Sequence, residues 1–473
     1  MQPHHIVQET TTMTLRDATL SPAQGAERPS FSALRSFKIG SFHIGSSLTD
    51  VALSGVWNRV MITDLGVVAW PVSLLLAARY FLAPLAIWAG HQSDTHPIFG
   101  SRRTAYIWLG RLAMLISLPL LPLSVGLIAE GNAALGWLLA TISLLLYGTG
   151  QSISGAPFLA LVHDSAPYER RGQAVSIVQF MLVVSFAFVP IVFARVMPDY
   201  SQAMFWRLVM VAMVGAAFFW LVSVLGEERR ARRIGTLPPA PPRNAARPSL
   251  RATLASIWSD RRTRRYALFL GFSAFFAFMQ DAVLEPFGGD VFGLSVGETT
   301  RFNAYWGTGV LISMAVTYGV TRRRRPDQQV GTAAWGLAML AVPVFLLSVA
   351  AMRQSLAMVV PVLVLFGVGF GVFTVGGTSL LMAVATADKA ASYLALWSVI
   401  QLICRGLGIA FGGALRDVFN QFTGEIAVAY AGVFAVEALG LLVAIWLLRR
   451  VDIPGFAAAH RSELAGQGAL TLE

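Results

Sequence analysis

The chain has 473 residues, of which 55% are hydrophobic and 13% are charged, and its formal net charge is +11. A water-soluble fold of this length could not cover so much apolar surface with so few charges, so the composition excludes a soluble globular protein. The basic residues gather between apolar runs, which indicates membrane topology and attraction to anionic headgroups and excludes nucleic-acid binding as their purpose.

Twelve apolar runs of membrane-spanning length follow one another along the chain. About twenty apolar residues cross a bilayer as one helix, and these runs are continuous where a barrel strand would alternate. Ser, Thr, His and Asp interrupt the first run, which makes it the weakest. We therefore predict an all-α membrane protein with spans at 40–62, 68–90, 104–128, 134–160, 172–196, 204–226, 265–287, 302–320, 331–351, 356–384, 393–415 and 427–448.

A polar stretch rich in Arg and Pro divides these spans into two groups of six. Most Lys and Arg lie in this stretch, in the tails and in the loops on the same side, so the positive-inside rule predicts that both termini are cytoplasmic. The predicted units are a cytoplasmic N-terminal tail at 1–37, a six-helix bundle at 38–226, a cytoplasmic linker at 227–264, a second bundle at 265–450 and a cytoplasmic C-terminal tail at 451–473.

The two halves share short phrases in corresponding spans. Residues 146–150 read LYGTG and residues 365–369 read LFGVG, while 176–179 (SIVQ) correspond to 398–401 (SVIQ) at nearly the same offset. This pattern indicates a duplicated six-helix unit and therefore two pseudo-symmetric bundles. Parallel six-span halves with a long joint are the plan of the major facilitator superfamily.

The loop between the second and third spans resembles the loop signature of that superfamily. An Asp at a helix end can bind loop arginines and an adjacent helix N-terminus, and such a latch would hold a cytoplasmic gate shut. The matching loop at 321–327 keeps the basic residues but lacks an Asp at the helix end, which counts against ordinary rocking transport. The predicted latch consists of Gly90, Asp94, Gly100, Arg102 and Arg103.

Polar residues interrupt the first and seventh spans, which are counterparts in the repeat. Such residues are costly in a bilayer and indicate function, although internal ion pairing that locks the bundles is their commoner role. His43 could ligate the magnesium of a tetrapyrrole, although a lone His is more often a hydrogen-bonding residue. The candidates for a central seam or pigment site are His43, Asp50, Asn58, Arg59, Gln280, Asp281 and Glu285.

The sequence carries no His-Glu-x-x-His motif, P-loop, cysteine cluster or Gly-x-Ser-x-Gly elbow. We therefore expect no enzymatic activity and no metal bound directly by the protein. An enzyme is therefore the least favoured of the functions that we consider.

Four phrases together resemble one branch of the superfamily. They are 58–67 (NRVMITDLGV), 93–96 (SDTH) with 100–108 (GSRRTAYIW), 280–297 (QDAVLEPFGGDVFGLSVG) and, more weakly, 396–407. Within about 35–450 the chain is similar to the PucC/LhaA-type light-harvesting complex assembly proteins of purple phototrophic bacteria, the bacteriochlorophyll delivery family.

The resemblance implies an assembly factor in the inner, intracytoplasmic photosynthetic membrane. Its expected partners are the light-harvesting α and β polypeptides, bacteriochlorophyll, the lipid bilayer and, further, the reaction centre or pigment-synthesis enzymes. It would act as a chaperone that delivers or shields pigment, with the core antenna LH1 favoured over LH2. The competing hypothesis is a proton-coupled transporter of a small solute that uses Asp50, Arg59, Asp281 and Glu285.

Overall fold

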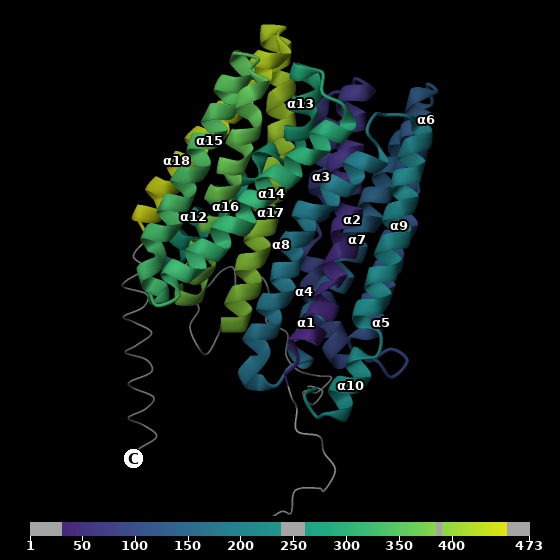
Figure 1. The fold of residues 1–473 in the computed structure, drawn as a ribbon, viewed down its shortest axis with the longest axis vertical. Helices are drawn as coiled ribbons and strands as arrows, with labels where there is room; N and C mark the ends of the chain where they lie inside the picture. Colours follow the sequence, from purple (N-terminus) through teal and green to yellow (C-terminus); the bar gives the residue numbers. More distant parts are fainter. Residues whose placement is uncertain (1–30, 238–260, 385–389, 452–473) are drawn as a thin grey trace, which may run out of the picture.

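The computed structural model describes residues 31–237, 261–384 and 390–451, which are almost entirely helical. Figure 1 shows the N-terminal helices packed beside the C-terminal helices, with α10 and α13 at opposite ends of the molecule. We call these two ends the α10 end and the α13 end.

The N-terminal half contains the first six predicted spans, several of which are divided. Proline lacks the N–H needed inside a helix, and Pro84 and Pro119 lie at the breaks within the second and third spans. Its helices are α1 (Ala33–Gly40), α2 (Phe42–Asp50), η1 (Val51–Trp57), η2 (Val60–Asp64), α3 (Ala69–Phe81), α4 (Ala83–Thr95), α5 (Thr104–Ser117), α6 (Leu120–Ala129), α7 (Ala133–Asp164), η3 (Tyr168–Arg170), α8 (Arg171–Val196), α9 (Gln202–Val224) and α10 (Glu227–Arg233).

The first span has an unusual backbone, because η1 and η2 are π-helical. The π-helical turn is rare and occurs mostly at functional sites. Three of the polar candidates, Asp50, Asn58 and Arg59, flank the two π-helical stretches, while His43 lies in α2.

The C-terminal half begins with α12, which starts inside the predicted linker. Its helix α14 opens with a reciprocal capping box between Ser295 and Glu298. The elements are α12 (Arg261–Ala277), η4 (Met279–Ala282), α13 (Leu284–Phe292), α14 (Val296–Thr321), η5 (Pro326–Gln329), α15 (Val330–Met352), α16 (Leu356–Val384), α17 (Ala390–Thr423) and α18 (Ile426–Arg449).

The span predicted at 265–287 is broken in the structure. The segment breaks at η4, and α13 continues at an angle of 40°. Pro286 cannot donate an N–H to the carbonyl of Ala282, and that carbonyl accepts Asn58 Nδ2 at 2.8 Å instead. The break therefore places a backbone acceptor of the seventh segment against the first.

Each half has its own apolar core. One core holds Trp57 and Trp220, and the other holds Trp397 and Tyr430. Small residues bring the helices close together in both: a Cβ at Gly367 would collide with the Trp306 carbonyl of the neighbouring helix.

Within the described residues, nine helices are long and apolar enough to cross a membrane, and the bent pair of α12–η4 with α13 would make ten. The first span and α14 are not in this set. The chain is therefore a multi-pass membrane protein, and the count of twelve spans stays a prediction.

The halves meet where α3 packs on α17 and where α8 packs on α14. Among the described residues, the hydrogen bonds between the halves lie toward the α13 end (Figure 1). They join Asn58 to Ala282, Arg59 to Leu294, Trp70 to Asp417, Ser73 to Ala410 and Gly297 to Pro198.

Candidate functional site

A cavity of about 620 Å³ lies between the two halves, which is the size of pockets that hold drug-sized ligands. Residues of the first and seventh segments contribute to its wall, as do α3, α5, α7, α8, α14, α16 and α17. Much of the wall is aromatic, through Phe42, Tyr80, Tyr147, Phe158, Phe186, Phe278, Trp306, Phe366 and Phe370. Such a wall suits a flat conjugated body.

Two ion pairs lie in this wall, one in each half. Arg79 of α3 donates a hydrogen bond to Asp50 of α2. Arg405 of α17 donates to Asp281 of η4 at 2.8 Å, and its guanidinium lies 3.9 Å from the centroid of the Phe278 ring. Both arginines therefore have carboxylate partners, which offsets part of the cost of burying them.

Glu285 has a different environment. Its side chain is 4% exposed, and Asn303 of α14 donates to Glu285 Oε1 at 2.6 Å. Trp306 in turn donates to Asn303 Oδ1 at 3.0 Å, which fixes the amide orientation. No Lys or Arg of the described chain forms an ion pair with Glu285, so its partners are neutral.

His43 lines the same cavity from α2. Its ring meets Phe42 and Phe158 edge-on, with centroid separations of 5.9 and 5.5 Å. Within the part of the chain that the structure describes, the imidazole makes no hydrogen bond. Its nitrogens are therefore free to bind a group in the cavity, although neutral packing among aromatic rings also accounts for the position.

Asn58 and Arg59 do not line the cavity. Asn58 is fully buried against Ala282, and Arg59 donates to Asp64 at 2.8 Å and to the Leu294 carbonyl at 2.9 Å. These two residues hold the first segment against the seventh at the α13 side. The remaining candidates, His43, Asp50, Gln280, Asp281 and Glu285, all line the cavity.

A second polar cluster lies at the α13 end. Arg416 donates to Asp290 at 2.9 Å and to Asp417 at 2.8 Å, and the Tyr430 hydroxyl donates to Asp290 at 2.6 Å. Asp417 also accepts the backbone N–H of Trp70 at 2.7 Å, which caps α3 from the opposite half.

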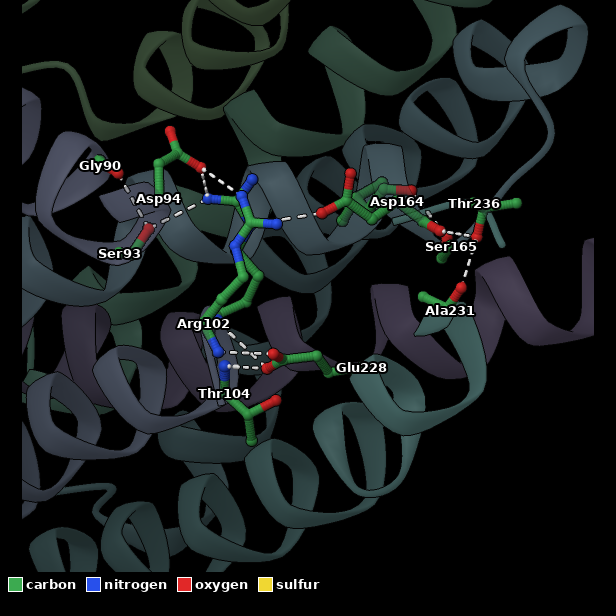
Figure 2. Close-up of polar contacts among 12 residues, drawn as sticks. Gly90, Ser93, Asp94, Arg102, Thr104, Asp164, Ser165, Glu228, Ala231 and Thr236 are labelled. Carbon is green, nitrogen blue, oxygen red and sulfur yellow. Dashed lines mark hydrogen bonds and ion pairs between the residues drawn. The ribbon is translucent and has the colours of Figure 1, made fainter. Parts of the chain in front are cut away.

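The predicted latch residues lie together at the α10 end. Arg103 pairs with Asp94 and also with Asp164 at 3.3 Å, and Arg102 lies 3.7 Å from Asp94. Gly90 contributes its carbonyl, which accepts the Ser93 hydroxyl at 2.9 Å. Figure 2 shows the three carboxylates of this latch cluster around the arginines; the cluster consists of Asp94, Arg102, Arg103, Asp164 and Glu228.

Gly100 belongs to the tight turn that brings the arginines back toward Asp94. Ile98 and Ser101 exchange backbone hydrogen bonds of 3.0 and 2.9 Å. Between them Phe99 and Gly100 both have positive φ, 48° and 73°. Such a two-residue turn favours glycine at its second position, which explains Gly100 in the motif.

The carboxylate that caps the helix after this turn was missed by the sequence reasoning. We expected Asp94 to bind the N-terminus of α5, but Glu228 occupies that place and accepts backbone N–H groups of Arg102, Arg103 and Thr104 at 2.5, 3.0 and 2.7 Å (Figure 2). Burial opposes the charge of Glu228, yet the backbone donors outweigh it and lower the pKa of the carboxyl below its ordinary value.

Glu227 is the second acid that the sequence placed in the linker. It pairs with Arg35 at 2.6 Å and with Lys38 at 2.8 Å, so it ties α10 to α1. Glu227 and Glu228 are each 4% exposed. The sequence signal that could have revealed these contacts is the acidic pair directly after an apolar span. A linker in contact with water would not need to bury charged side chains.

Several known proteins are similar in sequence to this chain over most of its length. The protein is 29% identical over 396 residues to the protein named PucC of Rhodovulum sulfidophilum, covering 81% of this chain and 85% of that one. It is 27% identical over 445 residues to a protein named the bacteriochlorophyll synthase 44.5 kDa chain of Rhodobacter capsulatus, covering 92% of this chain and 99% of that one. A third relative, from the puhA-bchM intergenic region of Rhodobacter capsulatus, is 28% identical over 86% of this chain and 84% of that one.

Solved structures share the fold at low sequence identity. A POT family transporter in complex with 5-aminolevulinic acid has a TM-score of 0.65 at 12% identity, covering 89% of this chain and 96% of that one. A bacterial homologue of the lysosomal transporter Spinster, in an inward-facing conformation, has a TM-score of 0.57 at 16% identity, covering 92% and 97%. These likenesses establish the major facilitator fold.

The family model described as PUCC protein matches residues 56–456, which include the latch cluster and most of the cavity wall, while His43 and Asp50 precede the matched range. The predicted resemblance is therefore confirmed, and the chain belongs to the PUCC protein family.

Proposed function

We propose that this protein is a non-catalytic assembly factor for the photosynthetic antenna. It binds light-harvesting α and β polypeptides and delivers or shields bacteriochlorophyll, with the core antenna LH1 as its client in preference to LH2. It acts in the intracytoplasmic part of the bacterial inner membrane, with both termini and the latch cluster on the cytoplasmic side. The pigment is cargo that the protein holds while antenna helices assemble.

The observation that carries this proposal is the aromatic cavity with His43 in its wall. A neutral imidazole is a common ligand for a metal in a macrocycle, and His43 makes no competing hydrogen bond to a described residue. Flat side chains surround it, so a conjugated ring could stack while a ring nitrogen of His43 approaches its metal. Family membership supports the same function through the PucC names of the relatives.

A gentle-detergent purification from phototrophically grown cells tests the proposal. We expect a pigment absorbance band and antenna polypeptides, identified by mass spectrometry, in the purified fraction, with LH1 chains in excess over LH2 chains. A fraction that carries neither pigment nor antenna chains, from a host that makes both, contradicts the proposal. An excess of LH2 chains contradicts only the choice of client.

Two histidine variants test the role of His43. His43→Phe keeps a flat ring but removes the nitrogen, so the pigment band should fall or shift. His163 is exposed and lies at the end of α7, outside the cavity wall, so His163→Phe is the matched control and should leave the band unchanged. Equal bands in both variants would remove His43 from the binding site.

A proton-coupled transporter is the second candidate function. It is favoured by two features of the central cavity, the Asp281–Arg405 ion pair and Glu285, whose hydrogen-bond partner is neutral. Carboxyl groups in such positions can take up and release protons during transport. Solute uptake into proteoliposomes that rises with a proton gradient and disappears in Asp281→Asn would support it. Solute uptake that does not depend on the proton gradient would exclude a proton-coupled transporter.

A further inference from the structure

Arg111 of α5 is a buried arginine in the cavity wall, with 4% of its surface exposed. Arg79 and Arg405 line the same cavity, and each of them forms an ion pair with an aspartate. Arg111 forms no ion pair with any residue that the structure describes. Among these three arginines it is therefore the one whose hydrogen-bonding capacity is left for a molecule in the cavity.

Of the three guanidinium nitrogens of Arg111, one has hydrogen-bond partners among the described residues. Nη1 donates to Ser46 Oγ at 3.3 Å and to Met114 Sδ at 3.2 Å, and both acceptors are neutral. Nε is buried and has no partner within this part of the chain. A guanidinium has five N–H donors, so most of those of Arg111 remain unused by the described residues. Leaving buried donors unsatisfied costs free energy, which an acceptor in the cavity would recover.

Aromatic rings hold this guanidinium in place. It lies 4.2 Å from the ring centroid of Phe42 and 4.7 Å from that of Trp220. Such cation–π contacts stabilise a desolvated cation through the face of the ring but occupy none of its N–H donors. The ring of His43 meets the same Phe42 ring, with a centroid separation of 5.9 Å. The imidazole and the guanidinium therefore lie within the breadth of one tetrapyrrole ring.

We propose that Arg111 donates hydrogen bonds to a ketone conjugated with the pigment ring while His43 binds the metal, so that two contacts fix the orientation of the ring. Bacteriochlorophyll is a neutral diester, and its keto groups are conjugated with the ring. Ring electrons increase the negative charge on a conjugated ketone oxygen, so it accepts better than an ester carbonyl, and a cationic donor strengthens the bond further. This inference rests on the proposed function and adds the group of the pigment that the cavity recognises. Arg111 is thereby a residue that determines specificity.

The test compares zinc pyropheophorbide a methyl ester with its deoxo analogue, in which a methylene group replaces the ring ketone. Both ligands are neutral esters, and both carry a metal with a free axial position. Binding to the full chain in lipid nanodiscs is measured by quenching of tryptophan fluorescence, with empty nanodiscs as the partition blank. We expect the ketone to bind about tenfold more tightly than the deoxo analogue, as for a hydrogen bond from a charged donor. Equal affinities overturn the inference and leave pigment binding and the proposed function intact.

The stretching band of the ketone gives a second readout, which a merely structural role of Arg111 would not move. A hydrogen bond weakens the C=O bond, so resonance Raman spectra of the bound ketone should show this band at lower frequency than in empty nanodiscs. A band that stays at the frequency of the free ketone overturns the inference, whatever the affinity.

Variants then assign both effects to one side chain. Arg111→Met removes every donor and should abolish the preference for the ketone and the shift of its band, whereas Arg111→Lys should keep part of both because a charged donor remains. Arg207 is exposed on α9 and does not line the cavity, so Arg207→Met is the matched control and should behave as the original protein. A preference and a band shift that survive in a folded Arg111→Met variant overturn the inference. If neither ligand binds the original protein, the inference fails, and pigment binding in the proposed function fails with it.

Discussion

Glu228 accepts the backbone N–H of Thr104 at 2.7 Å, across 124 residues of sequence. The contact joins α10, directly after the last span of the N-terminal half, to the first turn of α5. An anion at a helix N-terminus satisfies donors that have no partner within the helix and interacts favourably with the helix dipole. The start of the segment between the halves is therefore fixed to the latch cluster.

The first prediction concerns this cap. Glu228→Gln removes the charge that faces the N-terminus of α5, so the free energy of unfolding should fall by about 1–3 kcal/mol. Thermal unfolding of the purified protein in detergent, followed by tryptophan fluorescence, measures the change. Glu169 is exposed in η3, and Glu169→Gln should have no effect.

The same contact predicts a pH dependence. The pKa of Glu228 is lowered in the folded protein, so its stabilisation is fully present above the ordinary carboxyl value of 4.5 and is lost as pH falls through the lower folded value. The stability difference between the original protein and Glu228→Gln should therefore shrink below about pH 4.5. A difference that stays constant into stronger acid would show that the charge of Glu228 is not its cause.

The second prediction concerns the tie between α10 and α1. Glu227 is the shared carboxylate of Arg35 and Lys38, so Glu227→Gln should free α1 without affecting the cap on α5. Amide hydrogen exchange should rise over 33–40 and remain slow over 104–117. Faster exchange in both segments would mean that the two acids act as one unit.

The third prediction concerns the contact between the halves at α3 and α17. A Cβ at Gly413 would collide with the Ser73 hydroxyl and lie 3.0 Å from the Ala69 carbonyl. Gly413→Val should therefore separate these helices, lower the free energy of unfolding by about 1–3 kcal/mol and speed amide exchange at the start of α3. Gly319 also lies in a helix but has open space around its Cβ position, so Gly319→Val is the control. Slow exchange in Gly413→Val would contradict this packing.

Helix positions followed well from the apolar runs, because a span must be continuous and apolar over its full length. The predicted 331–351 corresponds to Val330–Met352, and 427–448 to Ile426–Arg449. The pairing of the first and seventh segments also followed, since they are repeat counterparts with polar faces, and Asn58 joins them through Ala282. The first inference rests on patterns within single segments, and the second rests on the repeat that relates the two halves.

Contacts between distant segments that the repeat does not relate could not be predicted from the sequence. Glu228 looked like a solvated linker residue, because the N-terminus of α5 that it caps comes much earlier in the chain. Arg111 could not be distinguished from Arg79 and Arg405, because the sequence does not show whether an arginine has a carboxylate partner. The break before α13 did leave a signal in Pro286, but a proline near the end of an apolar run is also compatible with an unbroken span.

The last prediction concerns Glu437, which is completely buried in α18. Among the described residues, neither carboxyl oxygen has a hydrogen-bond partner. Replacing an unpaired buried polar group by an apolar one of similar size removes its desolvation cost, so Glu437→Leu should raise the free energy of unfolding by about 1–3 kcal/mol. Thermal unfolding measures this, with the exposed Glu130→Leu as a control that should change little. A clear loss of stability in Glu437→Leu, with Glu437→Gln unchanged, would show that this carboxyl takes part in a hydrogen bond that stabilises the C-terminal half.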